Sequence, residues 1–520
     1  MVVTWELRAA FARDLAAMYG REVPAYETLV EVARAINAEV VGRDGGDAER
    51  LGSVARVSAE RHGAIRVGTP RELAQAARVF AAFGMQPVGF YDLRDAEPSP
   101  AAARLAGSRA VPRPVEGLRL TATSVPVVST AFRPLDADEL ARNPFRVFTS
   151  MLVVDDPRYF DADTRAGLQA FLADRMLFPP ELLALADRAA AEGGLPERDA
   201  EALLGRATAA FALSSIPVDR AWYDHLDAIS SVAADIGGVP TTHLNHLTPR
   251  VLDIDELQAR MRSRGIEMID EIQGPPAWEG PDVLLRQTSF RALAEDRVFR
   301  YPDGAVRTGA LRVRFGEVEQ RGIALTPRGR ALYDRMVAEA DARGGGPDGA
   351  REVWRRHLPA TERGLAEQGL AFFSYRIAEP VADAPRRARD VVKATFTAPD
   401  VLNVDFTTQQ RDVELRALVD AAVLVPEPIV YEDFLPRSAA GIFRSNLGGE
   451  GTRDEGRAAP EYDLARMAGV LGVTVHDPMD LYTAQQDASL RAAARTLCVR
   501  IIPTNTLMTN TLPTNTEETR

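Results

Sequence analysis

The sequence predicts a mixed α+β fold, and three observations lead to this prediction. Near the N-terminus, apolar residues such as Phe11, Leu15 and Met18 recur at helical spacing. Between residues 61 and 93, a short apolar segment, a capped helix and a second apolar segment follow one another. Further strand-like runs then alternate with helical stretches through the rest of the chain.

The first half of the chain is expected to contain helices to about residue 60 and then strands and helices in alternation. Thr69 can cap a helix that starts at Pro70, and Gly84 is a suitable end for it. Residues 88–93, 125–132 and 143–154 are expected to be strands, and 161–213 and 222–236 are expected to be helical. Residues 96–124 are rich in Ala, Pro, Arg and Gly without a clear period, which predicts a surface insertion.

In the second half, residues 242–255 read as an extended segment, because apolar and polar residues alternate from 251 to 255. A helix is expected at 257–264, then strands at 266–272, 283–290 and 311–320, and a helix at 327–340. A Gly-rich stretch near 342–349 predicts a boundary between a part at 1–341 and a second α/β lobe at 350–501. Residues 502–520 are dominated by Thr, Asn and Pro, and we expect a disordered tail.

Composition narrows the function classes. The net charge of −12, from 62 basic and 74 acidic residues, argues against a nucleic-acid partner, because phosphate binding needs clustered Lys and Arg. Cys498 is the only cysteine, so an intramolecular disulfide and a Cys-rich zinc site are both excluded. The N-terminal segment lacks a signal-peptide core, and the sequence contains no apolar run long enough to span a bilayer. These features predict a cytoplasmic protein with no membrane partner.

Six histidines include two, His243 and His246, that lie three residues apart in the extended segment. Side chains three apart on a strand point to opposite faces, so at most one of them is expected to serve a given site. A mononuclear iron site commonly uses two His and one carboxylate. The candidates are His62, then His243 or His246, then Glu317 or Glu319. The alternative is that these histidines are packed or exposed and that the two carboxylates face water.

Arg66 lies four residues after His62, on the same face of the expected strand. It is either a surface charge or, beside a metal, a group that holds a substrate carboxylate in a bidentate fork. Arg286 and Arg321 are further candidates for binding an anionic substrate. The remaining histidines are expected on exposed helices or in a loop and are assigned no role: His225, His357 and His476.

Several long blocks occur in one order along the chain, and they extend to about Tyr482. They are RHGAIRVGT, STAFRP, NPFRVFTS, HLNHLTPRVLDID, LLRQTSFRAL, RFGEVEQRGIALTPRGRALYD and YEDFLPRSAAGIFRSNLG. In these blocks the sequence resembles the 2-oxoadipate dioxygenase/decarboxylase family. The resemblance implies a vicinal oxygen chelate-like core, a curved β-sheet around a metal with added helical segments. It also implies Fe(II)-dependent conversion of 2-oxoadipate and O₂ to 2-hydroxyglutarate and CO₂, in lysine catabolism.

The same resemblance implies roles for particular residues. The matching motifs point to three metal ligands, with His246 preferred to His243 and Glu317 preferred to Glu319: His62, His246 and Glu317. They also point to residues that contact the substrate, with Arg66 as the catalytic one: His62, Arg66, His246, Arg437 and Ser438. Arg437 stands where other members carry a small apolar residue, so the preferred chain length depends on whether backbone or side chain binds there. The lobe at 350–501 would complete the substrate pocket.

Two rival functions remain at this point. One keeps the metal fold but is an isomerase or lyase that uses Zn, Mn or Ni, and oxygen consumption with metal analysis separates it from the dioxygenase. The other is a non-enzymatic protein that binds small dicarboxylates, which would bind ligand without forming product. In each case the expected partner is a small-molecule dicarboxylate, joined by O₂ for the dioxygenase, and the oligomeric state is left open.

Overall fold

The computed structural model of the protein describes residues 1–95, 119–120, 125–312, 314–395, 412–436, 438, 446, 452–454 and 456–502. Helices and strands both occur along these ranges, so the predicted mixed α+β class is confirmed. Most of the expected insertion at 96–124, residues 503–520 of the expected tail, and Arg437 lie outside the described residues. Among the described helices, none combines the length and the apolar character needed to cross a membrane.

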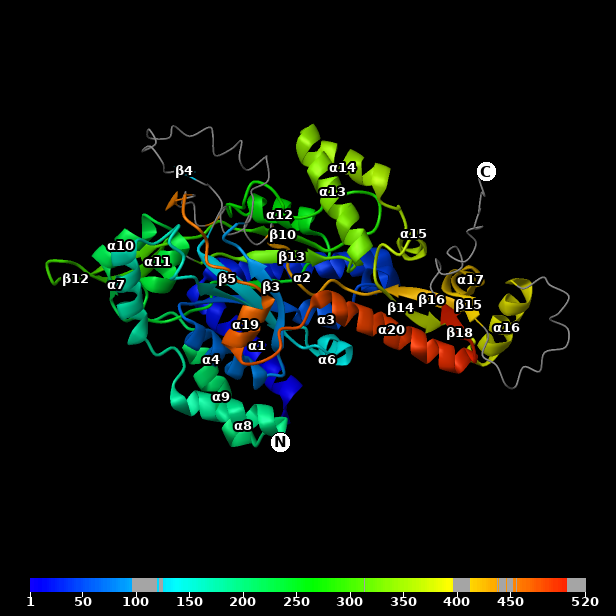
Figure 1. The fold of residues 1–520 in the computed structure, drawn as a ribbon, viewed down its shortest axis with the longest axis horizontal. Helices are drawn as coiled ribbons and strands as arrows, with labels where there is room; N and C mark the ends of the chain where they lie inside the picture. The colour runs from blue at the N-terminus through cyan, green and yellow to red at the C-terminus, as the bar shows by residue number, and fades with distance from the viewer. Residues whose placement is uncertain are drawn as a thin grey trace, which may run out of the picture.

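A central sheet organises the fold, and helices surround it (Figure 1). Its five strands occur in the order β3-β5-β6-β2-β9. β2 and β6 run parallel, and the other neighbouring pairs are antiparallel. In sheet order the strands are β3 (Gln86–Asp92), β5 (Val127–Arg133), β6 (Arg146–Leu152), β2 (Arg61–Val67) and β9 (His246–Pro249). The strand, helix and strand predicted for 61–93 are therefore present, with two other strands between them in the sheet.

A second strand pair continues this sheet past β9. The pair consists of β10 (Leu285–Ser289) and β13 (Glu317–Arg321), which are antiparallel. A parallel bridge joins Arg250, just after β9, to Glu319 in β13, and the Val251 amide donates to the Glu319 carbonyl at 2.8 Å. Residues from β2, β9 and β13 are thereby brought onto one surface.

The two faces of the sheet differ in character. Side chains alternate along a strand, and residues directly opposite in an antiparallel pair share a face. One face carries Ile65, Val147 and Leu247 into a large apolar core. On the other face Ala64 pairs with His246, and His62 pairs with Thr248. That second face carries many polar side chains, although it is buried.

The apolar face is covered by helices, as the N-terminal periodicity predicts. The helices that contribute to this core are α1 (Thr4–Glu22), α2 (Pro24–Asp44), α4 (Pro70–Ala81), α8 (Pro180–Glu192), α9 (Glu197–Ala210), α12 (Ile254–Ser263) and α19 (Leu464–Leu471). The predicted start of α4 is confirmed, because the Thr69 hydroxyl accepts from the Glu72 amide at 3.1 Å. Gly84 follows that helix with φ +67°, a conformation that favours glycine.

Helix boundaries differ from the prediction in two places. The single helix expected at 222–236 is two helices, α10 (Arg220–Asp227) and α11 (Ser231–Gly237), because the Ser230 hydroxyl caps a new start. The alternation at 251–255 does not form a strand. Asp253 instead accepts from the Glu256 amide at 3.0 Å and begins α12, which shows that a cap can override an alternating pattern.

Two predicted strands are also wrong. Residues 266–272 contain only an isolated bridge at Met268. The strand expected at 311–320 is divided between β12 (Val306–Leu311), which pairs with β11 (Glu295–Arg300), and β13. Between β12 and β13 the chain passes close to an aromatic ring, since a Cβ atom at Gly316 would lie 1.9 Å from Phe290. Such tertiary contacts leave no local periodicity.

The C-terminal half adds further helices and a small two-stranded sheet beside the central sheet (Figure 1), while its helix α19 packs against α4 in the apolar core. Its main elements are α13 (Pro327–Arg343), α14 (Gly346–His357), α15 (Glu362–Glu367), β14 (Phe373–Ile377), α16 (Ala384–Thr395), β16 (Leu424–Pro428), α19 (Leu464–Leu471) and α20 (Pro478–Leu497). After β16 the chain returns toward β13, where the Tyr431 amide donates to the Gly322 carbonyl at 2.9 Å. Residues 431–435 are thereby placed next to the polar face.

Candidate metal centre

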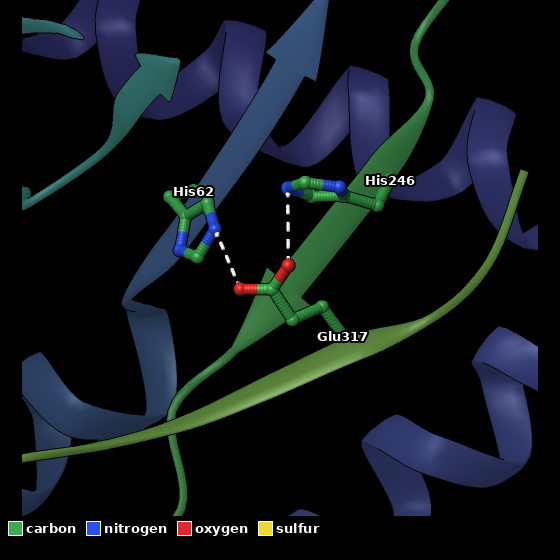
Figure 2. A group of neighbouring side chains, drawn as sticks. All are labelled: His62, His246 and Glu317. Carbon is green, nitrogen blue, oxygen red and sulfur yellow. Dashed lines mark ion pairs between the residues drawn. The ribbon is translucent and has the colours of Figure 1, made fainter. Parts of the chain in front are cut away.

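Three side chains from three strands converge on the polar face of the sheet (Figure 2). His62 belongs to β2, His246 begins β9 and Glu317 begins β13. One potential ligand atom of each lies within 4.8 Å of the other two. The Glu317 carboxylate lies between the imidazoles, with Oε1 3.3 Å from His62 Nε2 and Oε2 3.5 Å from His246 Nε2. This arrangement is compact enough for the three residues to share one cation.

The chemistry of this group fits a metal ion. All three residues are at most 5 % exposed. Both ring nitrogens of His246 lack a hydrogen-bond partner in the part of the chain that the structure describes. Buried polar atoms are normally satisfied, so nitrogens left without partners beside a carboxylate indicate a missing ligand. Two imidazoles and one carboxylate are also the donor set that suits a non-haem iron ion with open positions.

A second carboxylate approaches His62 from the other side of its ring. Glu319 Oε2 lies 2.9 Å from His62 Nδ1, and the Glu319 side chain is fully buried. Burial raises the pKa of Glu319, but Arg321, His62 and Arg146 more than offset it and hold the pKa at about 2. For His62, burial lowers the pKa, and Glu319 and Glu317 outweigh it so that the net shift is upward. The alternative that Glu317 and Glu319 face water is therefore wrong.

Glu319 is part of a buried network of charged residues behind the metal group. Arg321 donates to both of its oxygens, at 2.7 and 2.9 Å, and Arg146 approaches at 3.3 Å. Glu60 pairs with Arg146 at 2.8 Å and with Arg250 at 2.9 Å. The remaining members of the network are Glu432 and Arg56. Arg321, one of the arginines expected near the substrate, is thus engaged by this network.

Arg66 lies on the same face as His62, as predicted from their spacing, and forms a separate buried cluster. Its Nη1 donates to Asp235 Oδ2 at 2.5 Å, and Asn245 Nδ2 donates to the same oxygen at 2.9 Å. His243 Nε2 lies 3.4 Å from the other Asp235 oxygen. Burial raises the pKa of Asp235, yet His243 and Arg66 produce a net lowering. This cluster, not the metal group, is where the structure places His243.

His243 and His246 therefore have different surroundings. The described metal-ligand group contains His246 and omits His243. Burial lowers the pKa of His243 to about 3 and that of His246 to about 4, so both rings are neutral near pH 7. Neutral imidazole is the form that binds a metal. Arg286 also lies elsewhere, because its guanidinium pairs with Asp255 on α12 at 2.6 Å.

Residues 431–435 close one side of the site. The Phe434 ring lies 5.0 Å from both the His62 and the Phe148 ring centroids, and the Arg321 guanidinium lies over it at 5.7 Å. Asp433 anchors this segment by accepting from Arg133 at 2.8 and 3.1 Å. The aromatic ring keeps water from that edge of the imidazole.

Several of these neighbours were not found from the sequence. Gln287 Nε2 donates to Glu317 Oε1, and it lies directly opposite Glu319 in the β10–β13 pair. Asp235, Phe434 and Glu60 carried no usable local signal, although the two carboxylates at 317 and 319 did share a predicted face. Ser438 is described and is 4 % exposed. Its predicted contact with the substrate stays a prediction, as does that of Arg437.

Comparisons with known proteins match one family along nearly the whole chain. A family model described as 2-oxoadipate dioxygenase/decarboxylase matches residues 11–113 and 110–446. A protein of that name from Mycobacterium tuberculosis is 52% identical over 481 residues, covering 92% of this chain and 96% of the relative. One from Pseudomonas putida is 38% identical over 509 residues, covering 94% and 97%.

A solved structure extends this likeness to three dimensions. It is the hydroxyglutarate synthase from Pseudomonas putida in complex with 2-oxoadipate, with a TM-score of 0.72 and 35% identity, covering 96% of this chain and 99% of that one. The sequence identity to the Mycobacterium tuberculosis relative is 52%, and the match to the solved structure covers almost the full length of both chains. The chain therefore belongs to the 2-oxoadipate dioxygenase/decarboxylase family.

Proposed function

We propose that this protein is an Fe(II)-dependent dioxygenase that converts 2-oxoadipate and O₂ into 2-hydroxyglutarate and CO₂, as a step of lysine catabolism. The observation that carries the proposal is the buried group of His62, His246 and Glu317 in a chain of this family. The reaction balances, because both oxygen atoms of O₂ are retained in the two products.

The three ligands would hold the iron on one side and leave its remaining positions open. When bound, iron(II) supplies coordination positions for the 2-oxo acid and for O₂, and the electrons for oxygen activation. Glu317 is kept in place by Gln287, which donates to its Oε1. Phe434, which packs against Phe148, would exclude water beside His62 and so protect the reacting groups from solvent.

Arg66 would bind a carboxylate of the substrate. It is buried and lies on the same face as His62, and an arginine can hold a carboxylate through two parallel hydrogen bonds. The protein carries a net charge of −12, so a dianionic substrate depends on local positive charge of this kind. By motif, Arg437 and Ser438 would contact the distal carboxylate.

The wider organisation fits this assignment. We assign the metal site to residues 1–341, within a curved, vicinal oxygen chelate-like sheet, and the completion of the substrate pocket to the lobe at 350–501. The contact of Phe434 with His62 supports that division. A cytoplasmic location is consistent with the single cysteine, Cys498.

Turnover under controlled oxygen tests the function. The purified protein, loaded with Fe(II) without oxygen, is mixed with 2-oxoadipate in air-saturated buffer while O₂, CO₂ and 2-hydroxyglutarate are measured. We expect one O₂ consumed for each CO₂ and each 2-hydroxyglutarate formed. Loss of 2-oxoadipate to a different product without O₂ consumption would indicate a metal-dependent isomerase or lyase instead, and binding without any product would indicate a binding protein.

The ligand assignment is tested with two histidines that lie three residues apart. His246→Ala should lose bound iron and turnover, because it removes one of three ligands. His243→Ala should keep its iron, since that ring lies beside Asp235. The exposed His357 serves as a control for surface binding, and His357→Ala should behave like the native protein. Full iron content in His246→Ala would refute the assignment.

A further inference from the structure

We propose that Glu319 is a positioning residue that fixes the proton of His62 on Nδ1, so that Nε2 is always available to the metal. The proposal rests on the proposed metal role of His62. It concerns a residue that is not one of the three proposed ligands and that acts through the His62 imidazole.

The two nitrogens of His62 face two different carboxylates from one strand. Nε2 lies 3.3 Å from Glu317 Oε1, and Nδ1 lies 2.9 Å from Glu319 Oε2. Glu317 and Glu319 are two residues apart on β13, so their side chains share a face and reach opposite edges of the same ring. The two-residue spacing on β13 therefore places both Glu317, a proposed ligand, and Glu319, which contacts the other nitrogen of His62.

Toward His62, Glu319 can act only as a hydrogen-bond acceptor. Arg321 donates to both of its oxygens, Arg146 approaches one of them, and the side chain has no exposure to water. An ionised carboxylate offers acceptors and no donor. Nδ1, the nitrogen nearer to a carboxylate, then carries the proton, and a metal bound within the group would take the lone pair of Nε2.

The second imidazole has no matching support. Among the residues that the structure describes, His246 pairs with one carboxylate, that of Glu317, whose Oε2 lies 3.5 Å from Nε2. His246 therefore has no second carboxylate among these residues to select its tautomer, and the two histidines are held unequally. Most of the preorganisation of this site is expected to come from the Glu319–His62 contact.

The competing explanation is that Glu319 merely neutralises buried arginines. Glu60 provides a matched control, because it is also fully buried and also pairs with Arg146 and Arg321, at 2.8 and 3.2 Å. Its carboxylate is not paired with His62. If Glu319 served only the charge network, Glu319→Gln and Glu60→Gln would affect the metal site alike.

The test measures binding of Co²⁺ to the full-length metal-free protein by competition with a chromophoric chelator. Glu319→Gln should weaken Co²⁺ binding about 10–100-fold, the range found when outer partners of metal-bound histidines are removed. Glu319→Asp should also weaken it, because it keeps the charge for Arg321 but withdraws the oxygens from His62. Glu60→Gln should keep the native affinity for Co²⁺, although it should lose about as much thermal stability as Glu319→Gln.

Native affinity in both folded Glu319 variants, or an equal loss in Glu60→Gln, would overturn the proposal. Failure of the native protein to bind Co²⁺ would instead count against the proposed metal site. Because the Glu319 variants can fail to fold, a measurement on the native chain decides independently. In the Zn²⁺-loaded protein labelled with ¹⁵N-histidine, His62 should show a protonated Nδ1 and a metal-bound Nε2, and the reverse pattern would refute the proposal.

Discussion

Asp235 is expected to be essential to the stability of the Arg66 cluster. Its carboxylate accepts from Arg66 at 2.5 Å and from Asn245 at 2.9 Å, and both charged side chains are at most 3% exposed. Asp235→Asn removes the negative charge and leaves the guanidinium in a buried setting. Removal of one partner from a buried ion pair costs about 3–5 kcal/mol, because the remaining charge stays desolvated.

This cost corresponds to a measurable change in melting temperature. An unfolding entropy of about 2.1 cal/mol/K per residue gives ~1.1 kcal/mol/K for a chain of 520 residues that unfolds cooperatively. A loss of about 3–5 kcal/mol therefore lowers Tm by about 3–5 °C. The assay is thermal unfolding of the metal-free protein followed by circular dichroism.

Two comparisons make the result specific. Glu427 pairs with Arg376 at 2.7 Å on the surface, where both side chains are about half exposed, so Glu427→Gln should cost less than about 1 kcal/mol. The double variant Arg66→Gln, Asp235→Asn should be no less stable than Asp235→Asn alone, because it leaves no unpaired charge. A loss of stability in Asp235→Asn no larger than that in Glu427→Gln would refute this prediction. So would a double variant whose loss equals the sum of the losses of Arg66→Gln and Asp235→Asn measured separately.

Three further expectations concern packing, pH and the metal. Phe434→Ala should lower stability by about 3–5 kcal/mol, because it removes a buried ring beside His62, and unchanged thermal unfolding would contradict that packing role. Burial raises the pKa of Glu60, but Arg250 and Arg146 outweigh it and hold the folded pKa well below the ordinary 4.5. Its stabilisation is therefore complete above pH 4.5 and is lost as pH falls through the folded pKa, so Glu60→Gln should show a shallower acid dependence of Tm than the native protein. Restoring Fe(II) anaerobically at 100 times its Kd should stabilise the chelator-treated protein by about 2.7 kcal/mol, and an unchanged Tm would argue against a site specific to the folded state.

The sequence by itself determined the features that depend on local chemistry. The Thr69 cap and Pro70 predicted the start of α4, and side-chain alternation placed His62 and Arg66 on one face. The same alternation put Glu317 and Glu319 together, whereas His243 lies before β9 and beside Asp235, so strand alternation does not explain its separation from His246. The family motifs then selected His246 and Glu317, the two that join His62 in the structure.

Only the tertiary structure decided how these faces meet. The Asp253 cap ends the strand pattern that the alternation at 251–255 suggested, and β13 begins only after the break at Gly316. Glu60 and Arg146 are brought together from distant parts of the chain. Periodicity and capping act within a few residues, whereas burial and ion pairing depend on which distant elements pack together. For that reason the three residues of the candidate metal group could be predicted from the sequence, while the charged residues around them could not.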